Sequence, residues 1–560
     1  MQIGIAGSGP AAESVRAALD DIDATATAAT PDGLGAYPLG VVIAPAGAPA
    51  FEAADAATRR WIAVEIGGLG GRALDLDATV TIFDDGVGYR DLRERVASAV
   101  EADGDGDPTG SRSTVRLAGA IAGHRAVALL SGAESGGTVI EVPGGERRVL
   151  PVPDERDWTL RRTHRDASLD DALDRAERAV DDRVGLLTQV GERESFPAPY
   201  YLAATADTTV FSDAQAVPFT AGVDDDWDRA FMKALGEGLE RYCAGIYRRE
   251  EFVEAAPSAD EVAGRRPISP VAFVGVDDAA DEPIRWVPGE ELATGDAVSL
   301  PAEFVHYPPP VERHRPAITT GLGLGNSGVE ALLSGLYEVI ERDATMLGWY
   351  STYEPLGLSV DDEGFDALVA RARAERLTVT PLLLTADVDV PVVAVAVHRE
   401  GSWPRFAVGS GADLDAAAAA QSALAEALQN WMELRAMGLE EARGEEGAIG
   451  HYADFPAAAS SFVDVGGDVP AASVGPDSVP TGTAALDAVV DRVAEAGLDA
   501  YAARVTTADV ATLGFEAVRV LVPTAQPLFV DEPYFGERAE TVPRELGYEP
   551  RLDRAFHPYP

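Results

Sequence analysis

The sequence has a single cysteine, Cys243, and a single lysine, Lys233, among 560 residues. One cysteine excludes disulfides within the chain and zinc sites built from several thiolates. The seven histidines are scattered and form no close pair of metal ligands. No stretch has the length and apolarity of a membrane span. Residues 1–15 lack the basic region that opens a signal peptide, so we expect a cytoplasmic protein.

Positive charge is also scarce. The chain has 45 basic against 93 acidic residues and a formal net charge of −48. Such a chain repels the phosphates of nucleic acids and anionic lipids, so we expect neither nucleic acid nor membrane as a partner. Because dissolved salt screens this self-repulsion, the composition favours a halophilic protein, most typically an archaeal one.

With 46% apolar residues, the chain is long enough for two or three domains. Residues 2–7, 41–47 and 61–68 are predicted strands separated by helices, which favours a small Rossmann-like α/β layer over 1–105. Its first turn has the spacing Gly7-x-Gly9-x-x-Ala12. Because Pro10 lies in that turn and no acidic residue is placed to hold a ribose, we favour a structural or peptide-docking role over dinucleotide binding.

The rest of the chain is predicted in two parts. Residues 106–150 are interpreted as a linker and a β-rich connector that ends in a hairpin. Residues 151–560 are predicted to form a large α+β domain, in which helices near 226–250, 327–350 and 414–438 alternate with strands. The last residues, from 533 onward, are predicted to be an extended tail with little secondary structure.

Two of these helices share one motif, Glu-x-x-Glu-Arg. It is formed by Glu237, Glu240 and Arg241 in the first helix and by Glu338, Glu341 and Arg342 in the second. At about 100° per residue, each set lies on one helix face, opposite apolar residues. Lys233 joins the first face one turn earlier, and Glu330 joins the second.

An acidic stripe opposite an apolar one is also the pattern of an ordinary solvated helix face. Three features favour a binding site instead. Like charges three residues apart repel on a free helix. Residues 319–328 are rich in glycine, which suits a backbone that approaches a ligand closely. The only lysine stands beside the first pair, where an ammonium could meet a phosphate. Carboxylates from two facing helices would suit Mg²⁺, which binds through carboxylates, waters and phosphates.

Three ordered blocks of the sequence resemble the YcaO family of ATP-using enzymes that modify peptide backbones. They are KALGEGLERY (233–242), TTGLGLGNSGVEALLSGLYEVIERDA (319–344) and ALAEALQNW (423–431). The resemblance identifies the large α+β domain as a YcaO domain that binds ATP and Mg²⁺ between helices. It implies that a phosphoryl group is transferred to a backbone amide oxygen of a peptide or protein substrate.

The resemblance also implies roles for individual residues. The implied Mg²⁺ ligands are Glu237, Glu240, Glu330, Glu338 and Glu341. The implied nucleotide contacts are Lys233, Glu237, Glu240, Arg241, Asn326, Glu330, Arg342, Glu426 and Gln429. Lys233 departs from the family, in which many members have serine. Azoline-forming members end in a proline-rich tail that reaches the active site, and here His557, Pro558 and Pro560 match it, whereas Phe556 replaces the usual first proline.

The expected reaction is cyclodehydration of Cys, Ser or Thr to an azoline in a ribosomal peptide. Thioamidation, or another sulfur insertion through the same amide activation, remains open. A non-catalytic scaffold that presents peptides is a third interpretation. Family precedent implies a homodimer, and a leader peptide or a sulfur-transfer protein are further expected partners.

Overall fold

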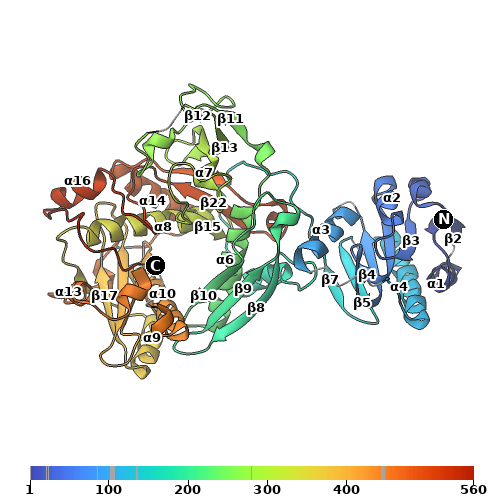
Figure 1. Cartoon of the computed structure of the whole chain (residues 1–560), viewed down its shortest axis with the longest axis horizontal. Coiled ribbons are helices and arrows are strands. Elements are labelled where there is room, and N and C mark those ends of the chain that lie inside the picture. Colours follow the sequence, from blue (N-terminus) through green and yellow to red (C-terminus); the bar gives the residue numbers. More distant parts are fainter. Residues whose placement is uncertain are drawn as a thin grey trace. The chain divides into compact units, whose positions relative to one another are not determined.

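The computed structural model describes residues 2–20, 22, 24–84, 86–100, 107–133, 136–278, 281–442 and 448–559. The chain divides into two compact units (Figure 1). The first unit contains Met1–Glu155, Glu177–Gln189 and Ala204–Ser212, and the second contains Arg156–Ala176, Val190–Ala203 and Asp213–Pro560.

The first unit is built on one seven-stranded sheet in the order β2-β1-β3-β4-β5-β6-β7. The strands are β1 Gln2–Ala6, β2 Thr25–Ala28, β3 Gly40–Pro45, β4 Trp61–Leu69, β5 Arg72–Phe83, β6 Thr138–Val142 and β7 Glu146–Arg148. β2, β1, β3 and β4 pair in parallel, whereas β4 to β7 pair antiparallel. The predicted strands near 2–7, 41–47 and 61–68 are therefore confirmed.

Helices cover both faces of this sheet. They are α1 Pro10–Asp20, α2 Ala50–Ala57, α3 Tyr89–Ala99 and α4 Arg112–Ser131. One apolar core joins the sheet to α1 and α4, and a second joins its other face to α2 and α3. The prediction of a linker and β-rich connector over 106–150 was wrong in its first half, because Arg112–Ser131 form the helix α4. Its second half forms the expected hairpin, β6–β7.

The second unit contains two sheets, in the orders β12-β14-β13-β21-β22-β15 and β19-β18-β17-β16-β20, and most of a third, β10-β9-β8, of which Leu187–Gln189 and Ala204–Thr205 belong to the first unit; β11 pairs with β13. Their strands are β8 Leu187–Glu194, β9 Tyr200–Thr205, β10 Phe219–Val223, β11 Val253–Ala255, β12 Arg266–Pro267, β13 Ile284–Glu291, β14 Ala297–Pro301, β15 Leu322–Gly325, β16 Leu356–Ser359, β17 Thr378–Leu383, β18 Val392–His398, β19 Phe406–Ala412, β20 Asp468–Pro470, β21 Tyr501–Arg504 and β22 Glu516–Leu521. Its helices are α5 Leu169–Ala176, α6 Trp227–Gly245, α7 Ala302–Val305, α8 Gly328–Trp349, α9 Glu363–Ala374, α10 Ala416–Met437, α11 Leu439–Ala442, α12 Ala448–Tyr452, α13 Ala457–Phe462, α14 Thr483–Glu495, α15 Ala508–Thr512 and α16 Arg538–Glu545.

Helix α8 is the central element of the second unit (Figure 1). Its 22 residues extend over about 33 Å. Its apolar side chains share one core with β17 to β19 and with β21 and β22. On the other face of the five-stranded sheet, α9 and α10 form a second core. The long helices predicted near 226–250, 327–350 and 414–438 are confirmed as α6, α8 and α10.

The glycine-rich segment before α8 allows close packing of protein on protein. A Cβ at Gly323 would lie 2.2 Å from the Ala331 carbonyl oxygen of α8, and one at Gly321, where φ is +91°, would lie 2.2 Å from the Val520 carbonyl oxygen. The sequence alone favours a role for these glycines in the close approach of a ligand to the backbone. In the structure, glycine is needed at these positions because this segment packs directly against α8 and β22, which leaves no room for a side chain.

The C-terminal segment is not a wholly extended tail, because Arg538–Glu545 form α16. Arg538 anchors this helix through ion pairs to Asp343, at 2.7 Å, and to Asp387, at 2.8 Å. In the part of the chain that the structure covers, no helix combines the length and apolarity needed to cross a membrane.

Candidate functional site

The polar face of α6 carries the first predicted acidic pair. Asp226 caps the helix by accepting a hydrogen bond from Asp228 N at 2.9 Å. Arg241 Nη1 donates to Glu240 Oε1 at 2.5 Å, and Arg241 Nη2 donates to Glu237 Oε1 at 3.2 Å. The motif thus places one guanidinium between two carboxylates.

The polar face of α8 carries the second pair. Glu338 Oε2 accepts a hydrogen bond from Gly321 N at 3.0 Å, which ties this face to the glycine-rich segment. Arg342 pairs with Glu341 at 3.4 Å. Ser410 Oγ of β19 donates to Glu341 Oε1 at 2.6 Å. The two acidic residues of α8 are therefore held by groups from different segments.

Helix α10 adds a carboxylate to the same place. Glu426 Oε1 lies 3.7 Å from Arg342 Nη2, and Glu426 Oε2 accepts from Ser410 N at 2.6 Å. Gln429, the other candidate on α10, donates instead to Glu433 at 3.1 Å.

These side chains meet around Glu338. Burial raises the pKa of Glu240 to about 7; Arg241 opposes that rise and Glu338 adds to it. Burial also raises the pKa of Glu341, and again the charge of Glu338 adds to the rise. For Glu426 the direction and the main cause are the same. We call Glu237, Glu240, Glu338, Glu341 and Glu426, with Arg241, Arg342 and Arg519, the carboxylate cluster.

Arg519 of β22 is the member that the sequence reasoning missed. Its side chain is buried, and its Nη1 and Nη2 donate to the carbonyl oxygens of Thr319 and Ile318 at 2.6 and 2.8 Å. Burial lowers its pKa to about 9, against the effect of Glu338. Its Nε has no hydrogen-bond partner among the described residues. A basic residue flanked by the apolar residues Val518 and Val520 in the strand EAVRVL is the signal that could have pointed to it.

Lys233 lies at the edge of the cluster. Its Nζ pairs with Asp224 Oδ2 at 2.7 Å and donates to the Val223 carbonyl oxygen at 3.3 Å. Its charge also acts on Glu426, where, with Arg342, it partly opposes the rise in pKa that burial causes.

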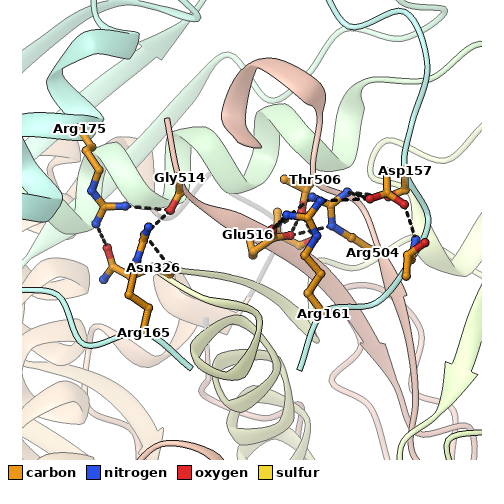
Figure 2. Close-up of polar contacts among 11 residues, drawn as sticks. Asp157, Arg161, Arg165, Arg175, Asn326, Arg504, Thr506, Gly514 and Glu516 are labelled. Carbon is orange, nitrogen blue, oxygen red and sulfur yellow. Dashed lines mark hydrogen bonds and ion pairs between the residues drawn. The ribbon is translucent and has the colours of Figure 1, made fainter. Parts of the chain in front are cut away.

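Asn326 and Glu330 form a separate group at the start of α8. Glu330 Oε2 accepts a hydrogen bond from Asn326 N at 2.7 Å. Figure 2 shows Arg165 and Arg175 converging on Asn326 and Gly514: Arg175 donates to Asn326 Oδ1, and Arg165 donates to its carbonyl oxygen at 2.6 Å. Eight residues separate Glu330 from Glu338, or about 12 Å along the helix axis. The structure thus divides the predicted residues of α8 between two places.

Two residues after Gly514, at the start of β22, Figure 2 shows Arg161 and Arg504 converging on Glu516. Arg504 Nε donates to Glu516 Oε2 at 2.7 Å, and Arg161 pairs with Glu516 Oε1 at 3.1 Å. Because these contacts fasten residues 156–166 to β21 and β22, they fix the chain that carries Arg165.

The end of the described chain is buried beside the cluster. His557, Pro558 and Tyr559 are all buried, and His557 Nε2 donates to the Phe529 carbonyl oxygen at 2.8 Å. The charges of Arg342 and Glu341 act on the Tyr559 phenol. Pro560, the third predicted tail residue, lies outside the described residues.

A nucleotide with divalent cations fits the cluster in two respects. Three carboxylates, that of Glu341 buried and those of Glu240 and Glu426 partly buried, have raised pKa values, so their negative charge is incompletely compensated by the arginines. The buried Nε of Arg519 is a donor that an anion could accept from. Within the described ranges, no three Asp, Glu, His or Cys side chains are already arranged to hold a metal ion. Mg²⁺ commonly uses one or two carboxylates and completes its shell with phosphates and waters, which agrees with this arrangement.

Comparison with known families gives the chain its class. Residues 221–526, more than half of the chain, match the family described as YcaO cyclodehydratase, ATP- and Mg²⁺-binding. The protein therefore belongs to the YcaO family, whose domain binds ATP and Mg²⁺. The matched range contains every member of the carboxylate cluster.

The individual proteins that the chain resembles share a third or less of its sequence over the aligned residues. An uncharacterized protein of Methanothermobacter thermautotrophicus is 32% identical over 229 residues, which is 38% of this chain and 57% of the relative's length. A heterocyclase solved in complex with substrate and cofactor has a TM-score of 0.73 at 19% identity, covering 98% of this chain and 83% of its own. The heterocyclase TruD has a TM-score of 0.64 at 17% identity, and the match covers 98% of this chain and 81% of TruD. At these identities the two structures show a shared mixed α/β fold.

Proposed function

We propose that the protein uses ATP and Mg²⁺ to phosphorylate a backbone amide oxygen of a peptide, and that cyclodehydration of Cys, Ser or Thr to an azoline follows. The observation that carries this proposal is the convergence of carboxylates from α6, α8 and α10 around Glu338. Membership of the YcaO family supports it. Phosphorylation would turn the amide oxygen into a leaving group, and a neighbouring substrate side chain would then attack the amide carbon.

The residues of the cluster would position Mg²⁺ and neutralise the phosphates of ATP, and they would form no covalent bond with the substrate. Glu237, Glu240, Glu338 and Glu341 would hold Mg²⁺, and Arg241 and Arg342 would offset the charge of the phosphates. Phosphoryl transfer needs little covalent chemistry from the protein, so placement and charge compensation supply most of the rate enhancement. Lys233, Asn326, Glu330, Glu426 and Gln429 would contact the nucleotide.

The buried tail favours cyclodehydration over sulfur insertion. His557 and Pro558 lie within the fold, in the segment whose Tyr559 is acted on by Arg342 of the cluster. A terminal segment held there can shape the space beside the amide, so that the substrate's own side chain attacks rather than an external sulfide. We further propose that the substrate is a ribosomal peptide and that the protein is a homodimer. In this proposal the first unit docks the leader segment of the peptide.

Binding and product analysis test the proposal separately. The wild-type protein should bind ATP only with Mg²⁺, and Glu237→Ala and Glu341→Ala should lose that binding. Glu440→Ala, at an exposed position on α11, should keep it. Mass spectrometry of a treated peptide should then show loss of one water per cyclised residue. Exchange of oxygen for sulfur would instead indicate thioamidation, and absence of Mg²⁺-dependent ATP binding by the wild type would indicate a scaffold.

A further inference from the structure

The Tyr559 side chain combines deep burial with an unused polar atom. It is 1% exposed and packs in the core that surrounds α8. Its hydroxyl has no hydrogen-bond partner within the part of the chain that the structure describes. Burying a hydroxyl in this way costs about 1–3 kcal/mol relative to one with a partner. Phenylalanine would fill the same space without that cost, so the retained oxygen calls for an explanation.

The segment that carries Tyr559 is firmly held. Trp349 Nε1 donates to the Ala555 carbonyl oxygen at 2.8 Å, and Arg554 Nη1 donates to the Trp349 carbonyl oxygen at 2.7 Å. The Arg554 guanidinium also lies 3.8 Å from the centre of the Trp349 ring. Together with the hydrogen bond from His557 to Phe529, these contacts fix the path of the chain, so the position of the phenol is not that of a frayed end.

The charged groups that act on the phenol leave its proton without an acceptor. They are Arg554, Arg342 and Glu341. Guanidinium groups only donate hydrogen bonds. Glu341 could accept, but among the described residues the Tyr559 hydroxyl makes no hydrogen bond to it. Burial raises the pKa of Tyr559 above its usual value, so at neutral pH the phenol keeps its proton and remains a donor.

We propose that the Tyr559 hydroxyl donates a hydrogen bond to the terminal phosphoryl group of ATP, on the side where Arg342 neutralises that group. This inference rests on the proposed function, because it assumes that Mg·ATP binds at the carboxylate cluster. Tyr559 would then be a binding residue for the phosphoryl group that is transferred, and a nucleotide that lacks this group would not use it.

Tyr559→Phe tests this inference because it removes only the oxygen. The probes are a non-hydrolysable ATP analogue and ADP, each with Mg²⁺, measured by calorimetric titration. We expect about 10- to 100-fold weaker binding of the ATP analogue, as for one hydrogen bond to a charged acceptor. We expect the affinity for ADP to change by less than about 2-fold. Without nucleotide, the variant should melt at the same temperature as the wild type or higher, because a buried unpaired hydroxyl is gone.

Tyr89→Phe is the matched control. The Tyr89 hydroxyl is also buried, but it donates to Glu65 Oε1 at 2.9 Å in the first unit. Its loss should lower the melting temperature and leave both nucleotide affinities unchanged, which is the opposite pattern. Equal binding of the ATP analogue by Tyr559→Phe and wild type would overturn the inference, as would an equal loss of affinity for both nucleotides. Failure of the wild type to bind either nucleotide with Mg²⁺ would instead refute the proposed function.

Discussion

Replacing Glu240 by glutamine should stabilise the metal-free protein above neutral pH. The Glu240 side chain is 13% exposed and pairs with Arg241. Burial raises its pKa from 4.5 to about 7 in spite of that partner. The folded protein therefore prefers the neutral acid, which a glutamine side chain imitates while its carbonyl oxygen can still accept from Arg241. Arg241 keeps Glu237 as a partner, at 3.2 Å.

The size and sign of the effect follow from the two pKa values. Because the folded-state pKa is the higher one, the wild-type carboxyl imposes no penalty below about pH 4.5. The penalty grows between pH 4.5 and 7 and is complete above pH 7. A rise from 4.5 to about 7 corresponds to roughly 3 kcal/mol at 1.36 kcal/mol per unit. Glu240→Gln should remove this penalty, so the two proteins should have equal stability near pH 4.5 and differ by about 3 kcal/mol at pH 8.

Chemical denaturation with a chelator present, repeated from pH 4.5 to pH 8.5, measures this difference. Glu440→Gln, on an exposed part of α11, should show no such trend. Adding Mg²⁺ and nucleotide should stabilise the wild type and leave Glu240→Gln almost unchanged, since the carboxylate is then needed. A difference that stays constant with pH, or a variant that is less stable than the wild type at pH 8, would refute the idea that Glu240 is an incompletely compensated buried charge.

Two further predictions concern the stability of the fold. Arg538→Ala should destabilise the second unit by about 3–5 kcal/mol in denaturation at pH 7, because it leaves Asp343 buried without its cation. Arg544→Ala in the same helix removes only an exposed pair and should cost less than about 1 kcal/mol; equal costs would contradict this account. Raising KCl from about 0.1 M to about 1 M shortens the screening length from about 10 Å to about 3 Å. The melting temperature should therefore rise for a chain with net charge −48, and a fall would contradict the halophilic interpretation.

The fold was predictable where side-chain periodicity was strong. Helices α6 and α8 each have an acidic face opposite an apolar face, and that pattern predicts both helices. Helix α4 was missed because glycines interrupt its pattern. Gly119 and Gly123 are there because α4 packs closely on α1: a Cβ at Gly119 would lie 2.2 Å from the Ala11 carbonyl oxygen. That requirement arises only in the packed structure. Helix α16 was missed for a similar reason, since it contains Pro543.

The candidate site was predictable only one helix at a time. Spacing along α6 and α8 placed Glu240 and Glu338 on polar faces, but it could not show that the two faces meet. That meeting depends on how β15 and β22 pack against α8. Arg519 enters from a strand, and Tyr559 enters from a terminal segment, so no helical period could reveal either one. The roles assigned to the cluster by resemblance remain predictions that the binding experiments above test.

Lys233, which pairs with Asp224, is a natural position for selective chemical labelling. Since the sequence holds no other side-chain amine, an acylating or reductively alkylating reagent has one ε-amino target, on a side chain that is 44% exposed. A fluorophore attached there would sit at the rim of the carboxylate cluster, where it could report on occupancy of the site without any engineered residue.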